Sequence, residues 1–155
     1  MTRFNVPTRD QVSEGNQAIF DALQAKLGMV PNLYASYAFS DAALKANLDY
    51  AEAFESNKNF RSKEIQAIYL AVSEANDCSY CLAAHTTLGK MAGFSEEETI
   101  ALRSGTIKDE KLKVLVDLTR EITLSRGRPS EGNLVAFFDA GFKEAHLIDL
   151  IGLVA

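Results

Sequence analysis

The sequence lacks any long apolar run. No stretch reaches the roughly 18 apolar residues that a membrane-spanning helix needs. The amino terminus, MTRFNVPTRDQVSEG, also has no apolar segment of the kind found in signal peptides. A clustered basic surface for binding phosphates is missing too, and the net charge is −5 at pH 7. We therefore expect a soluble, cytoplasmic protein that binds neither nucleic acid nor membranes.

Cysteine and histidine are scarce, with two of each in 155 residues. In a reducing compartment two cysteines seldom form a structural disulfide, so a C-x-x-C pair there indicates redox chemistry or metal binding. The sequence also has no glycine-rich phosphate loop, no Ser/His/Asp order and no haem attachment signature. The candidate reactive residues therefore lie in one segment, NDCSYCLAAH, at residues 76–85.

Strand signals are absent as well. No stretch shows the period-two alternation of a half-buried strand, whereas helix signals run the whole length of the chain. With 47% hydrophobic residues, the sequence predicts one globular, all-α domain over residues 1–155. The last residues, LIDLIGLVA, carry no helix stop. We therefore expect that the natural protein continues, or that this segment is buried against a partner.

Capping residues and glycines mark the expected helix boundaries. The predicted amino-terminal caps are Thr8 (in a capping box with Gln11), Ser40, Ser62, Asn76 or Asp77, and Ser95 (in a capping box with Glu98). The predicted stops are Gly28, Gly93, Gly127 and Gly141. MVPNLY, at residues 29–34, is expected to be a turn, and later helices are expected over about 109–125, 131–140 and from 143 onward.

Two segments resemble each other: GFSEEETIAL from Gly93 and GFKEAHLIDL from Gly141. They share Gly, Phe, Glu, Ile and Leu at matching places, 48 residues apart (141 − 93). This similarity indicates either a duplicated helical unit or two ordinary junctions at which a glycine ends one helix and a cap begins the next.

Three reactive side chains share one predicted helix face. At about 100° per residue, Cys78, Cys81 and His85 fall within an arc of about 60°. Cys81 and His85 are an i, i+4 pair, close enough for the imidazole to take the thiol proton. Both cysteines lie near the start of the helix, where free N–H groups and the helix dipole lower the pKa of a thiol. The pattern favours a reactive thiolate.

Redox chemistry follows from this arrangement. One thiolate attacks an oxidised substrate, and the other cysteine then closes a disulfide and releases the product, so no bound cofactor is needed. Two helical cysteines three positions apart are slightly too far from each other for an unstrained disulfide. We therefore expect the first turn of the helix to adjust on oxidation.

Two other interpretations remain open. Zinc could be bound by Cys78, Cys81 and His85, but structural zinc usually has four ligands, and only His146 is left to complete the set. The cysteines could also be inert packing residues in a non-catalytic helical oligomerisation module.

The segment SEANDCSYCLAAHTTLGKMAGFSEE resembles the AhpD-like alkylhydroperoxidases of the carboxymuconolactone decarboxylase superfamily. Their signature is C-x-x-C-x-x-x-H in an all-helical domain, and the resemblance is strong over about residues 60–105 and looser on both sides. It implies a thiol peroxidase or disulfide oxidoreductase that acts on a hydroperoxide or disulfide. It also implies an unidentified thiol reductant and a homo-oligomer, a trimer or hexamer. No cofactor or metal is implied.

The resemblance also assigns roles. Cys81 would be the thiolate that attacks peroxide, Cys78 its resolving partner, and His85 part of a proton relay. The relay carboxylate commonly stands twelve residues before the first cysteine, where this chain has Gln66. An amide cannot hold a proton or raise imidazole basicity as a carboxylate does. Glu74, four residues before Cys78, is the other candidate for that carboxylate.

Overall fold

A computed structural model describes residues 5–155, and within that range it contains helices and no strand. The predicted all-α fold is therefore confirmed. The chain forms two compact units, Met1–Ala53 and Phe54–Ala155. Among the described residues, no helix is both long and apolar enough to cross a membrane.

The first unit is built from short helices around a small core. It contains a 3-10 turn at Arg9–Gln11, α1 at Glu14–Leu27, α2 at Asn32–Tyr37 and most of α3, which spans Asp41–Ser56. Its core consists of Phe20, Ala35, Ala38 and Leu44. The buried side chain of Asn16 donates to Ala38 O at 2.9 Å and to the Asp41 carboxylate at 2.8 Å. This amide ties α1 to the junction between α2 and α3.

Two boundary predictions in this unit were only partly right. The capping box of Thr8 and Gln11 closes only the 3-10 turn, and α1 begins later, with Ser13 accepting the N–H of Asn16 at 3.3 Å. An extended residue, Val12, separates the two (φ −115°, ψ 165°). MVPNLY is only partly a turn, because α2 begins at Asn32 after Pro31. The predicted stop at Gly28 (φ 75°) and cap at Ser40 are confirmed.

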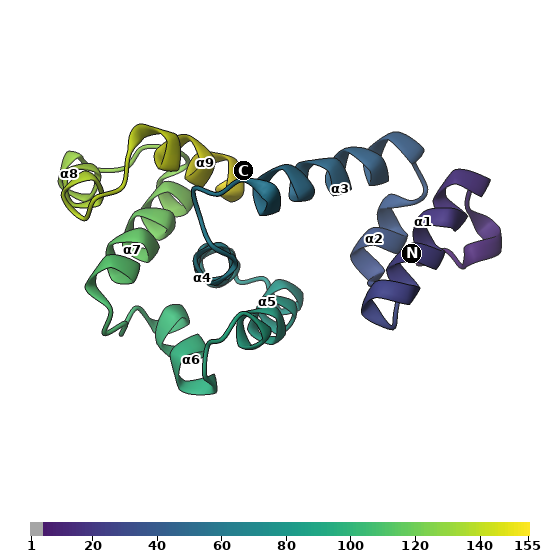
Figure 1. Ribbon diagram of the computed structural model, residues 1–155, viewed down its shortest axis with the longest axis horizontal. Coiled ribbons are helices and arrows are strands. Elements are labelled where there is room, and N and C mark those ends of the chain that lie inside the picture. Colours follow the sequence, from purple (N-terminus) through teal and green to yellow (C-terminus); the bar gives the residue numbers. More distant parts are fainter. Residues whose placement is uncertain (1–4) are drawn as a thin grey trace. The chain divides into compact units, whose positions relative to one another are not determined.

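Helix α4, at Ser62–Ala75, is the centre of the second unit. It contacts α5 (Ser79–Met91), α6 (Glu96–Ser104), α7 (Glu110–Ser125) and α9 (Glu144–Val154), while α8 (Glu131–Asp139) packs on α7. Figure 1 shows α4 end-on with these neighbours around it. A helix that is apolar on most sides is stable only when it is surrounded. Helix α4 is surrounded in this way, and half of its residues are buried: Ile65, Gln66, Ala67, Ile68, Leu70, Ala71 and Ser73.

The two sides of α4 contribute to different clusters. Ile65 and Ile68 pack with α7, α8 and α9 residues, whereas Ala67, Leu70 and Ala71 pack with residues of α6 and α7 and with Phe94. The side of α4 that faces α5 carries the polar side chain of Gln66. Fixing α5 against this side is what positions the candidate site.

Most helix boundaries of the second unit match the predictions. Gly93 (φ 101°) and Gly141 (φ 86°) follow helix ends, and Ser95 and Glu98 form the predicted capping box at 3.1 and 2.7 Å. The helices predicted over 109–125, 131–140 and from 143 are α7, α8 and α9. The prediction that Ser62 caps α4 was wrong. The cap is Arg61, whose N–H donates to Glu64 Oε2 at 2.8 Å, so the Glu64 side chain supplies the capping acceptor.

The end of α3 and the following linker are held by α9. The Phe54 ring lies so close to Gly152 that a Cβ there would clash with it. Asp149, also on α9, accepts hydrogen bonds from the amides of Asn57 at 2.6 Å and Asn59 at 2.7 Å. The position of the linker before α4 therefore depends on two neighbouring turns of α9.

Candidate active site

A tight reversal joins α4 to α5 and sets the place of the first cysteine. The N–H of Cys78 donates to Ser73 O at 2.9 Å, and the N–H of Asp77 donates to Glu74 O at 3.1 Å. Asp77 is left-handed, with φ 50°, a conformation that aspartate and asparagine tolerate better than most residues. The reversal brings α5 back along α4, so side chains of the two helices meet.

Cys78 itself caps α5. Its backbone is extended (φ −92°, ψ 92°), and its Sγ accepts the N–H of Cys81 at 3.3 Å. The prediction that Asn76 or Asp77 would be the cap was wrong, because Asp77 is used for the left-handed turn and Asn76 ends α4. Cys78 therefore lies just outside the helix, and Cys81 lies in its first turn.

The two cysteines are joined in a disulfide, with their Cα atoms 5.3 Å apart. This separation lies within the usual range for disulfides. We expected both cysteines to be helical, but Cys78 is extended. Because Cys78 has extended geometry at the cap, its sulfur reaches Cys81 from outside the first turn.

His85, one turn after Cys81, is held from α4. Its Nδ1 lies 2.9 Å from Gln66 Oε1, and its ring stacks on Tyr69, with centroids 4.6 Å apart and planes 27° apart. Since an amide oxygen only accepts, Nδ1 carries the hydrogen and Nε2 is the unprotonated nitrogen. Among the described residues, no hydrogen bond joins His85 to either sulfur.

Burial lowers the pKa of His85 to about 4. The imidazole is therefore neutral at pH 7, because moving a charged ring out of water is unfavourable and no carboxylate among the described residues forms a hydrogen bond with it. A neutral ring with a free Nε2 is suited to accepting a proton transiently. It is not suited to holding a permanent positive charge beside a thiolate.

Of the two candidate relay residues, the structure brings only Gln66 to His85. Glu74 instead forms an ion pair with Arg103 of α6, with Oε2 and Nε 2.8 Å apart, and both side chains are more than a third exposed. Tyr69 was missed by the sequence reasoning. It lies three residues after Gln66, on the same face of α4, and this spacing could have revealed it.

No group of three or more His, Cys, Asp or Glu side chains that could hold a metal occurs in residues 5–155. His146, the proposed fourth zinc ligand, caps α9, its Nδ1 accepting the N–H of Lys143 at 3.1 Å. Its ring packs edge-on against Phe60 and Phe142. His146 therefore belongs to a different cluster of side chains from the cysteine site.

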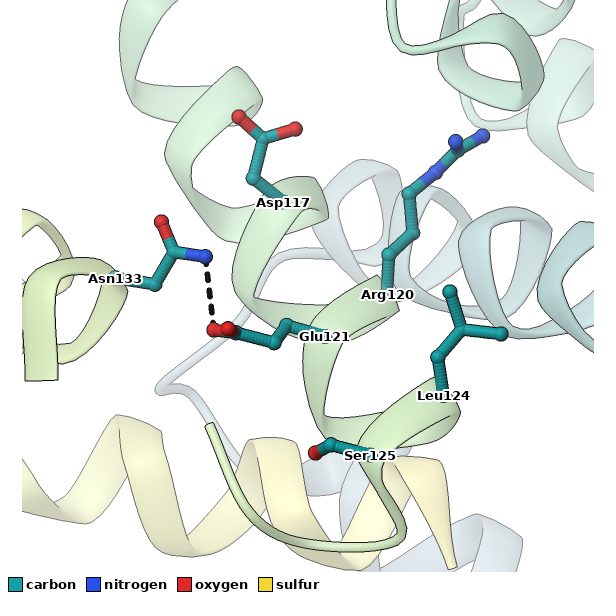
Figure 2. Close-up of a pocket in the computed structure, with 6 residues that line it drawn as sticks. All are labelled: Asp117, Arg120, Glu121, Leu124, Ser125 and Asn133. Carbon is teal, nitrogen blue, oxygen red and sulfur yellow. Dashed lines mark hydrogen bonds between the residues drawn. The ribbon is translucent and has the colours of Figure 1, made fainter. Parts of the chain in front are cut away.

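A surface pocket lies on α7 and α8, and none of the residues of the cysteine site lines it. It is lined by Asp117, Arg120, Glu121, Leu124, Ser125 and Asn133. Figure 2 shows Asn133 donating to Glu121, at 2.8 Å. This bond is the main cause that lowers the pKa of Glu121. The pocket contains no cysteine or histidine, so its side chains offer no thiol chemistry.

The comparisons with solved structures agree on the fold. A peroxidase-related protein from Silicibacter matches with a TM-score of 0.88 and 24% identity, over 97% of this chain and 81% of that one. A peroxidase-related protein from Ralstonia eutropha, described as an alkylhydroperoxidase AhpD core, gives 0.88 and 20%, over 98% and 82%. The debrominase Bmp8, in complex with 2,3,4-tribromopyrrole, gives 0.82 and 13%, over 99% and 83%. No curated protein matches the sequence.

The family model of the carboxymuconolactone decarboxylase family matches residues 41–107. This segment includes α4, the reversal at Asp77 and the whole cysteine site. The fold around it is shared with the AhpD-like structures. The resemblance noted in the sequence is therefore confirmed: residues 41–107 match the model of the carboxymuconolactone decarboxylase family, and the chain has the helical fold of the AhpD-like structures.

Proposed function

We propose that this protein is a thiol-dependent peroxidase or disulfide oxidoreductase that works through Cys78 and Cys81. One observation carries the proposal: a disulfide lies at the start of α5, one turn before a histidine whose Nδ1 is held by Gln66. The pair requires no metal or organic cofactor to exchange two electrons, because the two sulfurs store them.

The oxidative half-reaction proceeds in two steps. Cys81 loses its proton and attacks the distal oxygen of a hydroperoxide, which breaks the O–O bond, gives a sulfenic acid on Cys81 and releases an alcohol. The Cys78 sulfur then attacks the sulfenic acid, forms the disulfide and releases water. With a disulfide substrate, the same two steps pass through a mixed disulfide and release two thiols. An external thiol reductant restores the dithiol.

His85 is the proton acceptor in this scheme. It follows Cys81 by four residues on the same helix, and its unprotonated Nε2 accepts the thiol proton during attack. Gln66 does not touch the reacting atoms. It is a positioning residue, because its Oε1 holds the hydrogen on Nδ1 and thereby keeps Nε2 free.

The test is a peroxide titration with thiol counting. The chain is reduced, freed of reductant, and mixed with increasing amounts of hydrogen peroxide or cumene hydroperoxide. We expect one equivalent of peroxide to remove two thiols, and we expect turnover once a dithiol is supplied. The Cys78→Ser/Cys81→Ser variant is the control for non-enzymatic oxidation.

Other outcomes would point elsewhere. Stoichiometric zinc in the purified chain by elemental analysis, with thiols resistant to peroxide, would support the zinc-binding interpretation. Oligomers without any thiol turnover on peroxides or small disulfides would support a non-catalytic module. Either result would overturn the proposal.

A further inference from the structure

The two sulfurs of the disulfide are not equivalent. Cys78 Sγ lies at the cap of α5 and accepts the N–H of Cys81 at 3.3 Å, whereas no hydrogen bond to Cys81 Sγ is found among the described residues. The free N–H groups and dipole at the start of a helix favour an anion, and they act most strongly at the cap position. Cys78 therefore occupies the position that best stabilises a departing thiolate.

We propose that an external thiol reduces the disulfide by attacking Cys81 Sγ, with Cys78 leaving as a thiolate held by the Cys81 N–H. This inference rests on the proposed redox function, and it specifies the direction of the reductive half-reaction. In thiol–disulfide exchange, the sulfur with the lower thiol pKa leaves faster. The difference in position between Cys78, at the cap, and Cys81, in the first turn, therefore decides which sulfur is attacked.

Reduction of the disulfide takes two exchange steps. An external thiolate RS⁻ forms a bond to Cys81 Sγ, and the Sγ–Sγ bond breaks with its electron pair going to Cys78. A second external thiolate then attacks the R-bearing sulfur of the mixed disulfide, forms RSSR and releases Cys81 as a thiolate. Two protons from solvent convert the two protein thiolates to thiols. The protein disulfide gains two electrons, and two external thiols are oxidised.

The nearby titratable groups do not favour a thiolate on Cys78. Asp77 immediately precedes Cys78 and is exposed, and its carboxylate opposes a thiolate there. Glu74 lies one turn earlier but is paired with Arg103. His85 is neutral and contributes no charge to either sulfur at pH 7. The backbone hydrogen bond at the cap is therefore the favourable interaction that distinguishes the two cysteines, and the Asp77 charge limits its size.

The decisive experiment maps the first adduct. The oxidised wild-type chain is mixed with glutathione, and samples are quenched within milliseconds in acid containing N-ethylmaleimide, because Cys78 returns to the mixed disulfide unless it is trapped. Chymotrypsin cleaves after Tyr80 and so separates the two cysteines for mass spectrometry. We expect glutathione on Cys81 and maleimide on Cys78, exceeding the reverse pattern by roughly fivefold or more. Equal labelling, or an excess of glutathione on Cys78, would overturn the inference.

A second measurement compares the thiol pKa values directly. Thiolate absorbance near 240 nm is titrated in Cys81→Ser, which retains Cys78, and in Cys78→Ser, which retains Cys81. We expect the lower pKa in the chain that retains Cys78. Adding Asp77→Asn, which keeps the left-handed turn but removes the charge, should lower the pKa of Cys78 more than that of Cys81. A lower pKa for Cys81 would contradict the assignment.

These experiments separate this inference from the proposed function. Adduct mapping needs only the disulfide and an added thiol, so it can succeed in a chain that consumes no peroxide. In the opposite case, a chain that turns over peroxide but collects glutathione on Cys78 keeps the proposed function and loses the inference.

Discussion

Gln66 Oε1 and His85 Nδ1 lie 2.9 Å apart, so a neutral amide on α4 orients a neutral imidazole on α5. A carboxylate at this position would form an ion pair with the protonated ring, and this would raise the pKa of the ring. The amide instead fixes the tautomer without adding charge. In the proposed mechanism His85 is therefore an oriented but weak base, because burial lowers its pKa to about 4.

Gln66→Glu should strengthen that base. A carboxylate beside Nδ1 raises the pKa of His85, so Cys81 loses its proton more readily and reacts at lower pH. General-base assistance contributes about 10² to 10⁴-fold, and we expect restoration of a weakened base to raise the rate of peroxide reduction several-fold. The measurement is single-turnover peroxide reduction as a function of pH.

The control for this prediction is Glu74→Gln, which removes the other candidate carboxylate. Because Glu74 is engaged with Arg103, we expect its loss to leave the pH profile unchanged. An unchanged or slower rate in Gln66→Glu with the fold intact would contradict the relay argument. In that case the buried charge repels the thiolate more than it assists the imidazole.

Replacing either cysteine by serine should affect peroxide reduction in a different way. Cys81→Ser should abolish peroxide consumption, because it removes the attacking sulfur. Cys78→Ser should keep a first turnover and accumulate a sulfenic acid on Cys81, since the resolving sulfur is gone. A sulfenic-acid trap followed by mass spectrometry locates the product. Trapped sulfenic acid on Cys78 in the Cys81→Ser chain would reverse the roles.

Acid should destabilise the fold through His85. The unfolded chain protonates this ring near pH 6.5, whereas the folded chain protonates it only near pH 4. Between these values the unfolded state binds more protons, so the stabilisation is complete above pH 6.5 and is lost as the pH falls toward 4. The total is about 3 kcal/mol in the free energy of unfolding. Urea denaturation at several pH values measures it.

Two histidine variants test this assignment. His85→Gln should flatten the pH dependence between 6.5 and 4, because the titrating ring is gone. His146→Gln removes the other histidine and should leave the loss of stability in place. A pH dependence that persists in His85→Gln and disappears in His146→Gln would show that the wrong ring was assigned.

Gly152→Ala should destabilise the second unit. An added Cβ clashes with the Phe54 ring, and overpacking of this kind costs about 1–3 kcal/mol. Gly132→Ala on α8 is the matched control, because a Cβ there meets nothing within 4 Å. Alanine should stabilise that helix by up to about 1 kcal/mol. Thermal denaturation should therefore shift in opposite directions, and a shared direction would contradict the packing argument.

We also expect a homo-oligomer. The carboxy-terminal segment LIDLIGLVA buries Leu150 and Leu153 but leaves Ile148 66% exposed and Ile151 46% exposed. Apolar surface of this kind is typical of an interface. Light scattering should give a multiple of the monomer mass, reduced by Ile148→Glu with Ile151→Glu but not by the surface control Lys108→Glu. A monomer mass for the wild type at all micromolar concentrations would exclude the oligomer.

The helix boundaries that could be predicted from the sequence are those set by local chemistry. Gly28, Gly93 and Gly141 end helices because the backbone there takes a positive φ, which glycine adopts without strain. The α2 helix was missed because Pro31 and a short apolar stretch also fit a turn, and the buried contacts of Ala35 with the first unit's core favour the helix. Such contacts are tertiary, so residues 29–37 alone could not reveal them.

The residues of the site could likewise be predicted only in part from the sequence. Cys78, Cys81 and His85 were found from their spacing, and Gln66 from the family resemblance, but which residue caps α5 was not. Asn76 and Asp77 have the stronger capping propensity, yet the tight reversal uses Asp77 for its left-handed turn and leaves the cap to Cys78. The tautomer of His85 and its stacking on Tyr69 depend on how α5 lies against α4, which sequence periodicity does not specify.

The reversal at Asp77 also bears on how the site forms during folding. Every side chain of the site, from Gln66 to His85, lies on one antiparallel pair of helices joined by this turn. The contacts between them are therefore close in sequence, and closing so short a loop costs little entropy. We expect the thiol pair and its histidine to assemble with the α4–α5 hairpin itself, before α9 returns from the far end of the chain to cover the other side of α4.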